Sequence, residues 1–233
     1  MQLQVDSPIH GLVKLDLVEL EVYYQSEDHA DPFVHGHLDQ LTNNCWYFHK
    51  QARSYRAGTY KGLDITFGDS SCYGGLLIRS VAFNNRLIEG PCRTVNLLLE
   101  LLGIERIDQL VAFDEPALNV THERLKLISR TESLVAEVIR GPRVGLSLKS
   151  AEATDNCWWY YHQLPYRFVV QRYLGQIKKQ RFLLSLPERW IRDRYKLWFE
   201  AGQAMSLSDF PVKVTRVQEL CELYGCWWTA HMS

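Results

Sequence analysis

The chain of 233 residues lacks several features that would place it in a special class of protein. It has no run of about 18 apolar residues, so we expect no transmembrane helix. Residues Met1 to His10 carry no basic segment followed by an apolar stretch, so we expect no secretory signal. A hydrophobic content of 46% with 23% charged residues excludes a disordered or fibrous chain.

The cysteines lack the spacing of a metal ribbon or a disulfide framework. There are six of them, none in a C-x-x-C pair: Cys45, Cys72, Cys92, Cys157, Cys221 and Cys226. A chain of this length has enough residues to form a core without disulfide cross-links. We therefore expect unpaired thiols in a reducing compartment.

A net excess of charge is also missing, since 26 Lys plus Arg face 27 Asp plus Glu, and this balance argues against nucleic acid. The charges are, however, separated along the chain. Acids dominate the first 39 residues: Asp6, Asp16, Glu19, Glu21, Glu27, Asp28, Asp31 and Asp39 against Lys14. Bases dominate residues 165–196: Arg167, Arg172, Lys178, Lys179, Arg181, Arg189, Arg192, Arg194 and Lys196 against Glu188 and Asp193. Either two solvated faces neutralise each other, or a basic face exists that the total conceals.

Residues 13–24 alternate apolar and polar side chains and predict a β-strand with an irregularity. The alternation shifts by one residue at Leu17–Val18, as a β-bulge would cause. Glu19, Glu21 and Tyr23 then point to one face. Two carboxylates there indicate either a solvent-exposed face or a site. Arg79 lies on an apolar strand and needs a carboxylate, so Glu19 or Glu21 is its expected partner.

The remaining pattern predicts a mixed α/β domain up to about residue 170 and a helical extension rich in Trp and Arg over residues 171–233, packed on that domain. We expect a loop over 25–50, a polar turn at 68–71, and a polar, helical or loop segment over 105–133. The expected strands are 62–67, 75–83, 133–139, 143–148 and 166–170, and the expected helices begin at Pro91, Ser185 and Thr215.

Several of these segments resemble, in order, motifs of the alkyladenine (3-methyladenine) DNA glycosylase family. They are Val18–Tyr23, Asp31–His35, Asn44–Phe48, Gly74–Arg79, Gly90–Arg93 with Gly103–Ile104, Gly141–Gly145 and Leu164–Phe168. The resemblance covers residues 12–170. It implies an α+β fold: a single mixed domain built on a curved antiparallel sheet with flanking helices.

The resemblance also implies a chemistry, in which a damaged purine nucleotide is flipped out of duplex DNA and its N-glycosidic bond is hydrolysed. The family's general base matches Glu21, and its water-holding arginine matches Arg79. Val144 lies in the segment that contributes a further backbone contact, and Tyr23 and His35 match the residues that stack on the flipped base. The implied enzyme is monofunctional and needs no cofactor.

Two positions depart from the family pattern. Asp64 stands where the family has the asparagine that screens exocyclic groups, and an ionised carboxylate only accepts hydrogen bonds. Ala57 stands where the family has the tyrosine that wedges into the DNA stack, and Tyr55 is the nearby candidate for that role. The candidate DNA-binding residues are Tyr55, Arg53, Arg56 and Lys61.

Three functions follow as alternatives. The first is a monomeric base-excision glycosylase that acts on duplex DNA with damaged purines, inside the cell in the nucleus or in the nucleoid and cytoplasm, without membrane contact. The second is a protein of the same fold that binds nucleic acid or nucleoside without cleaving it. The third is a metal-dependent hydrolase that uses His29, His35 and His37, although the spacing supplies no diagnostic third ligand and we assign no metal residue.

Overall fold

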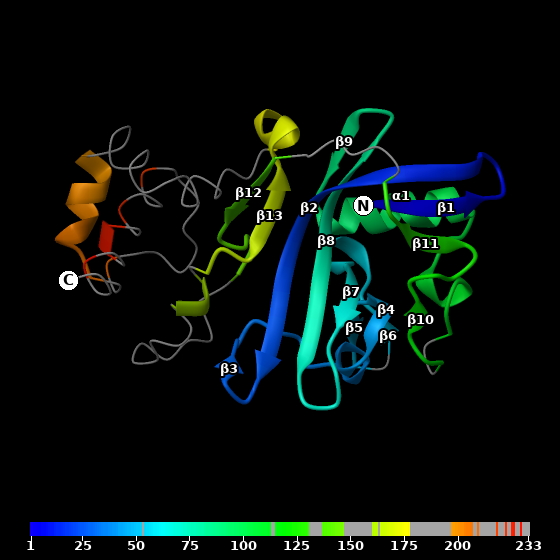
Figure 1. Ribbon diagram of the computed structural model, residues 1–233, viewed down its shortest axis with the longest axis horizontal. Coiled ribbons are helices and arrows are strands. Elements are labelled where there is room, and N and C mark those ends of the chain that lie inside the picture. Colours follow the sequence, from blue (N-terminus) through cyan, green and yellow to red (C-terminus); the bar gives the residue numbers. More distant parts are fainter. Residues whose placement is uncertain are drawn as a thin grey trace. The chain divides into compact units, whose positions relative to one another are not determined.

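The computed structural model describes residues 1–52, 54–112, 115–130, 137–146, 160–162, 164–177 and 197–206, together with positions 209, 218, 222, 225, 226 and 229 (Figure 1). These residues form two compact units. The first contains Met1–Glu137 and Val169–Gln176, and the second contains Val138–Phe168 and Ile177–Ser233. The expected domain boundary near residue 170 stays a prediction.

The first unit is built on a large curled antiparallel sheet and has few helices, which confirms a mixed α+β fold. Its strands follow the order β10-β4-β7-β8-β2-β1-β11 across the sheet. Their bounds are β1 Gln2–Ser7, β2 Gly11–Ser26, β4 Asn43–Phe48, β7 Leu63–Phe67, β8 Tyr73–Phe83, β10 Leu118–Asn119 and β11 Leu125–Ile128. The short strands β3 (His29–Ala30) and β9 (Arg86–Glu89) pair with β2 and β8.

The long strands β2 and β8 lie side by side through this sheet and carry the predicted bulge (Figure 1). Their register shifts between Leu17 and Glu19 and again between Glu19 and Leu20. The strand over 13–24 and its irregularity are therefore confirmed. The polar turn before β8 is also confirmed, because the Asp69 carboxylate accepts hydrogen bonds from the backbone N–H groups of Ser71 and Cys72.

Two segments expected to lack strands contain them. The predicted loop over 25–50 holds the 3₁₀-helix η1 (Leu38–Leu41) and strand β4, and the segment over 105–133 holds the 3₁₀-helix η3 (Ile107–Gln109) and strands β10 and β11. Between β4 and β7 lie the hairpin β5 (Lys50–Gln51) and β6 (Ser54–Tyr55) and the 3₁₀-helix η2 (Gly58–Tyr60). Long-range pairing with β1 and β7 outweighs the weak local pattern of these short strands.

Helix α1 (Pro91–Leu102) begins at the predicted residue, Pro91, and covers the core of the first unit with one apolar stripe. The stripe residues Val95, Leu98, Leu99 and Leu102 are all buried. Pro91 occupies the first turn, where its missing N–H costs nothing. Gly103 ends the helix in the left-handed conformation at φ 66°, and its N–H donates to Glu100. A proline thus begins the helix, and a glycine at positive φ ends it.

Replacing Gly103 with alanine is expected to lower the free energy of unfolding by about 1 kcal/mol or more, because a side chain there is strained at positive φ. An added Cβ would also lie 2.9 Å from Cγ of Pro8. Urea denaturation measures the change. Glu100→Ala, an exposed change on the same helix, is the control and should stay within about 0.5 kcal/mol. Equal effects of the two changes would contradict the conformational argument.

The second unit contains β12 (Val138–Gly141) and β13 (Arg167–Val170), which pair with each other, although β13 ends in the first unit. Strand β13 matches the prediction over 166–170. The strand expected at 143–148 is wrong over 143–146, where the chain forms no strand and bends at Val144 and Gly145. Residues 197–203 are helical, whereas 185–196 and the segment from Thr215 to Val217 lie outside the described residues. In the described part of the chain, no helix is long and apolar enough to span a membrane.

Candidate functional site

The bulge in β2 turns two glutamates toward the interior. Glu19 and Glu21 are 1% and 0% exposed, so the interpretation of this strand face as solvent-exposed is wrong. A bulge inserts a residue and thereby re-aims the side chains that follow it. A buried charge requires a partner of opposite sign or several hydrogen bonds. The predicted bulge thus places two carboxylates inside the protein, where they need a cation or several hydrogen bonds.

Arg79 of β8 forms ion pairs with both carboxylates, as predicted. Its Nε lies 3.1 Å from Oε1 of Glu19, and one terminal guanidinium nitrogen lies 3.1 Å from Oε2 of Glu21. Arg79 is itself 7% exposed. Burial lowers the pKa of its guanidinium, but the carboxylates of Glu21 and Glu19 outweigh burial and hold that pKa above its ordinary value. Arg79 therefore remains charged and joins both carboxylates.

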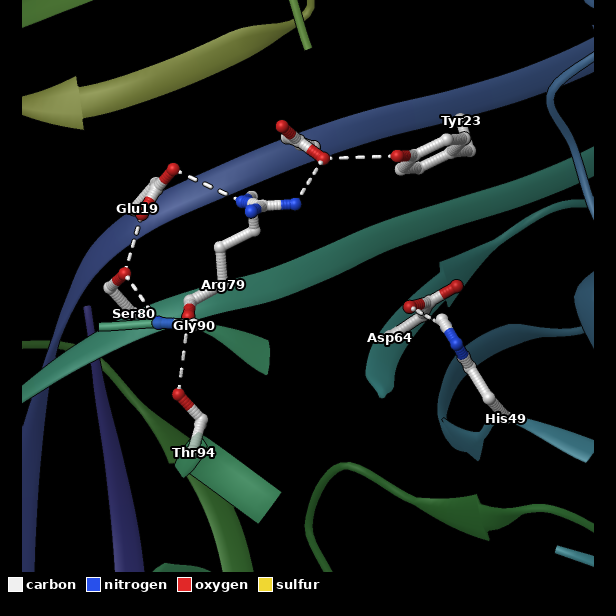
Figure 2. A network of polar contacts seen from close by, with 9 residues as sticks. Glu19, Tyr23, His49, Asp64, Arg79, Ser80, Gly90 and Thr94 are labelled. Carbon is white, nitrogen blue, oxygen red and sulfur yellow. Dashed lines mark hydrogen bonds and ion pairs between the residues drawn. The ribbon is translucent and has the colours of Figure 1, made fainter. Parts of the chain in front are cut away.

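A second layer of hydrogen bonds connects this ion-pair network to α1 (Figure 2). Ser80 donates to Oε2 of Glu19 at 2.5 Å and accepts from the backbone N–H of Gly90 at 3.4 Å. Thr94, in the first turn of α1, donates its hydroxyl to the carbonyl of Arg79 at 3.3 Å. These contacts fix Glu19 and the backbone of Arg79 against the start of the helix.

Tyr23 approaches the network from its other end. Its hydroxyl donates to Oε2 of Glu21 at 3.0 Å, so one oxygen of that carboxylate accepts from both Tyr23 and Arg79. The structure therefore brings together three of the predicted site residues. An oxygen that accepts two hydrogen bonds is held in a defined direction, which suits a carboxylate that must orient a second group.

Asp64 lies on the same face of the sheet as Glu21. Glu21 is opposite Leu77 of β8, and Leu77 is opposite Asp64 of β7. Directly opposed residues place their side chains on one face. Asp64 is 2% exposed, and its Oδ1 lies 2.8 Å from Nε2 of His49, as a pair separate from the Arg79 network (Figure 2).

His35 lies in a cluster of rings beside Asp64. Its ring centroid is 4.4 Å from that of His49 and 6.3 Å from that of Tyr47, and His37 stacks on Tyr47 at 5.2 Å. Although His35 keeps an exposed edge, loss of hydration against this cluster lowers its pKa to about 4. His49, Arg56 and His37 add to the lowering, and Asp64 opposes it. A neutral imidazole at physiological pH results.

The His35 imidazole is expected to stay neutral from pH 7 down to about pH 5 and to protonate near pH 4. Its folded pKa lies below the ordinary value of 6.5, so unfolding takes up a proton and stability falls as the pH drops from 6.5 to 4. Histidine chemical shifts measured against pH test this. His49→Ala should move the His35 pKa upward, toward 6.5. A wild-type His35 that titrates near 6.5 would contradict the cluster geometry.

The predicted DNA-binding residues have different environments. The Tyr55 hydroxyl donates to the carbonyl of Val111 at 3.2 Å, and burial raises the pKa of Tyr55 to about 12. Lys61 donates to Asn96 at 2.8 Å. Nε of Arg56 is buried and has no hydrogen-bond partner among the described residues. Arg53 lies outside the described residues.

A cavity of about 410 Å³ lies beside these residues, and Glu21 does not line it. Its wall includes β6, η2, α1 and the segment around η3. The lining residues are Ser54, Tyr55, Ala57, Gly58, Lys61, Leu99, Glu105, Arg106, Ile107 and Asp108. This cavity is therefore distinct from the surroundings of the Glu21 carboxylate.

Val144 is 3% exposed and belongs to the second unit. Its neighbour Arg143 is fully buried and donates to the carbonyl of Tyr161 at 3.1 Å. Within the described ranges, no three His, Cys, Asp or Glu side chains come close enough together to hold a metal ion. This statement includes His29, His35 and His37, the candidates for the third function.

Sequence reasoning missed three residues near Asp64: His49, Tyr47 and Gln40. His49 and Tyr47 lie on or beside β4, which was expected to be loop, so the alternation that places them on the Asp64 face was not used. Gln40 belongs to the capping box of η1, in which the His37 side chain accepts from Asp39 N–H and Gln40 accepts from His37 N–H. That pattern was the signal that could have located it.

Comparison with known proteins identifies a related viral protein. No protein-family model matches the chain. The chain is 40% identical over 189 residues to the "Uncharacterized protein L759" of Acanthamoeba polyphaga mimivirus. The match covers 74% of this chain and 82% of the viral protein. At that identity and coverage, the chain belongs to the same protein family as the mimivirus protein L759.

Proposed function

We propose that the protein is a monofunctional DNA glycosylase of the methylpurine-glycosylase type, which removes a damaged purine by means of a water activated by Glu21. The observation that carries the proposal is the Glu21 carboxylate, whose Oε2 accepts from Arg79 at 3.1 Å and from Tyr23 at 3.0 Å. The family motifs assign catalysis and base contact to these three residues. Their mutual contact supports that assignment, and the curled antiparallel sheet is consistent with it.

The chemistry requires a base, a nucleophile and an exposed glycosidic bond. The bond is inaccessible within stacked duplex DNA, so the nucleotide must be flipped out. Glu21 takes a proton from water as the water oxygen bonds to C1′ of the sugar. The C1′–N bond breaks, and its electron pair leaves with the purine. Since water is the nucleophile, the products are the free base and an abasic site.

Access is the main structural demand on this mechanism. Glu21 is fully buried, whereas its neighbour Tyr23 is partly exposed. Water and C1′ therefore reach the carboxylate only when side chains on this face move apart. Tyr23 is the natural residue to move, because it contacts both the surface and Glu21. In this proposal, its ring then stacks on one side of the flipped base, and His35 stacks on the other.

The proposed substrate is duplex DNA with damaged purines, bound by a monomer in the nucleus or in the nucleoid and cytoplasm. Arg56 and Lys61 would supply cations to the phosphates, together with Arg53 and the basic segment 165–196. Tyr55 would fill the position of the wedge. Its hydroxyl must first leave the carbonyl of Val111.

Base release from a panel of duplexes tests the proposal. The panel contains 3-methyladenine, hypoxanthine and ethenoadenine, and the readout is free base detected by chromatography. Wild-type protein is expected to release at least one of these bases and to leave an alkali-labile abasic site. Failure to release any of them, by a folded protein, would overturn the proposed activity.

A second candidate function is binding without cleavage on the same fold. Complete burial of Glu21 within an ion-pair network favours it, because the same arrangement would serve as a structural core pair. In this case, the protein binds duplex DNA or nucleosides but releases no base. Gel-shift measurements on the same panel separate the two functions.

A further inference from the structure

The cavity of about 410 Å³ that η2, α1 and η3 line has the size of a small-molecule binding site. Part of its lining is apolar, because Leu99 of α1 and Ile107 of η3 are only 5% and 4% exposed and belong to the core of the first unit. Tyr55 adds its ring, and the carbonyl of Val111 holds its hydroxyl at 3.2 Å. These three side chains offer a fixed apolar surface to the hydrocarbon part of a ligand.

Four charged side chains line the same cavity, and two of them compensate each other. Nε of Arg106 lies 3.0 Å from Oδ1 of Asp108. Lys61 donates to the neutral amide of Asn96 at 2.8 Å. In the part of the chain that the structure describes, neither Lys61 nor Glu105 forms an ion pair. The cavity therefore offers one cation and one anion to a ligand.

These two charges belong to opposite ends of the cavity. Lys61 is bonded to Asn96, in the second turn of α1. Glu105 instead follows the last residue of the helix, Leu102, and six residues of α-helix rise about 9 Å. Leu99 lies between these two levels, on the same face of the helix as Asn96. A ligand that meets both charges must be elongated and apolar in its middle.

We propose that this cavity binds a short linear peptide with an apolar middle, its free carboxyl end at Lys61 and its free amino end at Glu105. A tripeptide has the required length, because three extended residues span about 10 Å. Ser54 supports a peptide over a plain hydrocarbon chain. Its hydroxyl donates to the carbonyl of Gln51, so its oxygen can accept a peptide N–H. The carboxylates of Glu105 and Asp108 disfavour a ligand that carries phosphate.

Isothermal titration calorimetry of the full chain with the tripeptide Ala-Leu-Ala tests this site. The free peptide is expected to bind at least tenfold more tightly than its N-acetylated or its C-amidated form, because each blocked form loses one charged hydrogen bond. Leucine alone should also bind at least tenfold more weakly, because its two charges share one carbon. Equal affinity for free and blocked peptides, equal affinity for leucine, or no binding of the free peptide at millimolar concentration would overturn the inference.

Two variants assign each end of the peptide to its partner. Lys61→Met should lower the affinity for the free peptide about tenfold and leave that for the C-amidated form unchanged, because the two changes remove the same contact. Glu105→Gln should act in the same way with the N-acetylated form. Lys14→Met and Glu100→Gln are the matched controls, exposed and outside the cavity, and should not change binding. A Lys61→Met variant that weakens free and amidated peptides equally would contradict the proposed contact.

This inference goes beyond the proposed function, because neither DNA nor Glu21 takes part in it. The two proposals therefore fail in different ways. If the protein binds Ala-Leu-Ala as expected but releases no base from any duplex, the glycosylase proposal is wrong and the peptide site stands. If it releases a base but does not distinguish the free peptide from its blocked forms, the peptide site is wrong and the glycosylase proposal stands.

Discussion

Glu21→Gln is expected to reduce single-turnover base release by about 10²- to 10⁴-fold, the contribution of a positioned general base. The carboxamide keeps the shape of the side chain but cannot accept the proton of the attacking water. Tyr23 and Arg79 can still donate to the remaining amide oxygen, so DNA binding should change little. The rate constant on the most reactive duplex of the panel, with enzyme in excess, measures the effect.

The net charge of the buried network indicates that the Glu21→Gln variant will fold. Glu19, Glu21 and Arg79 together carry one net negative charge when all three are ionised, and Glu21→Gln makes the network neutral. Arg79 keeps its ion pair with Glu19. Glu100→Gln, an equivalent change on the exposed side of α1, is the control. Activity within tenfold of wild type, from a protein with a native circular dichroism spectrum, would contradict the role of Glu21.

The predictable part of this site is the part set by local pattern. Alternation over 13–24, broken once at Leu17–Val18, was enough to predict the strand, its bulge and the shared face of Glu19 and Glu21. The partner of Arg79 followed from the cost of leaving a guanidinium uncompensated on an apolar strand. Neither prediction depends on which strands are neighbours, whereas the sequence alone allows either a solvent-exposed face or a site for the two glutamates.

The pairs around Asp64 depend instead on long-range register. His49 reaches Asp64 because β4 and β7 pair, and that register contains its own irregularity between Asn43 and Trp46. The residues of β4 begin with two asparagines and continue with aromatic side chains, so no clear alternation distinguishes the segment from a loop. The periodicity of the sequence cannot predict a contact that depends on a strand without clear alternation and on the register of that strand.

Arg79→Met is expected to produce the largest loss of stability, about 3–5 kcal/mol, because it leaves Glu19 and Glu21 buried without their common cation. Methionine keeps much of the volume and the straight chain of arginine, so the loss measures charge rather than a cavity. Urea denaturation at pH 7 gives the free energy of unfolding.

The triple variant Arg79→Met, Glu19→Gln, Glu21→Gln separates this electrostatic effect from simple loss of contacts. It removes all three charges, and replacement of a complete buried ion network is often neutral for stability. Most of the stability lost in Arg79→Met should therefore return, while Ser80 and Tyr23 can still donate to the two amide oxygens. If the triple variant is as unstable as the single one, Arg79 stabilises the sheet through its packing, and the charge argument for the network fails.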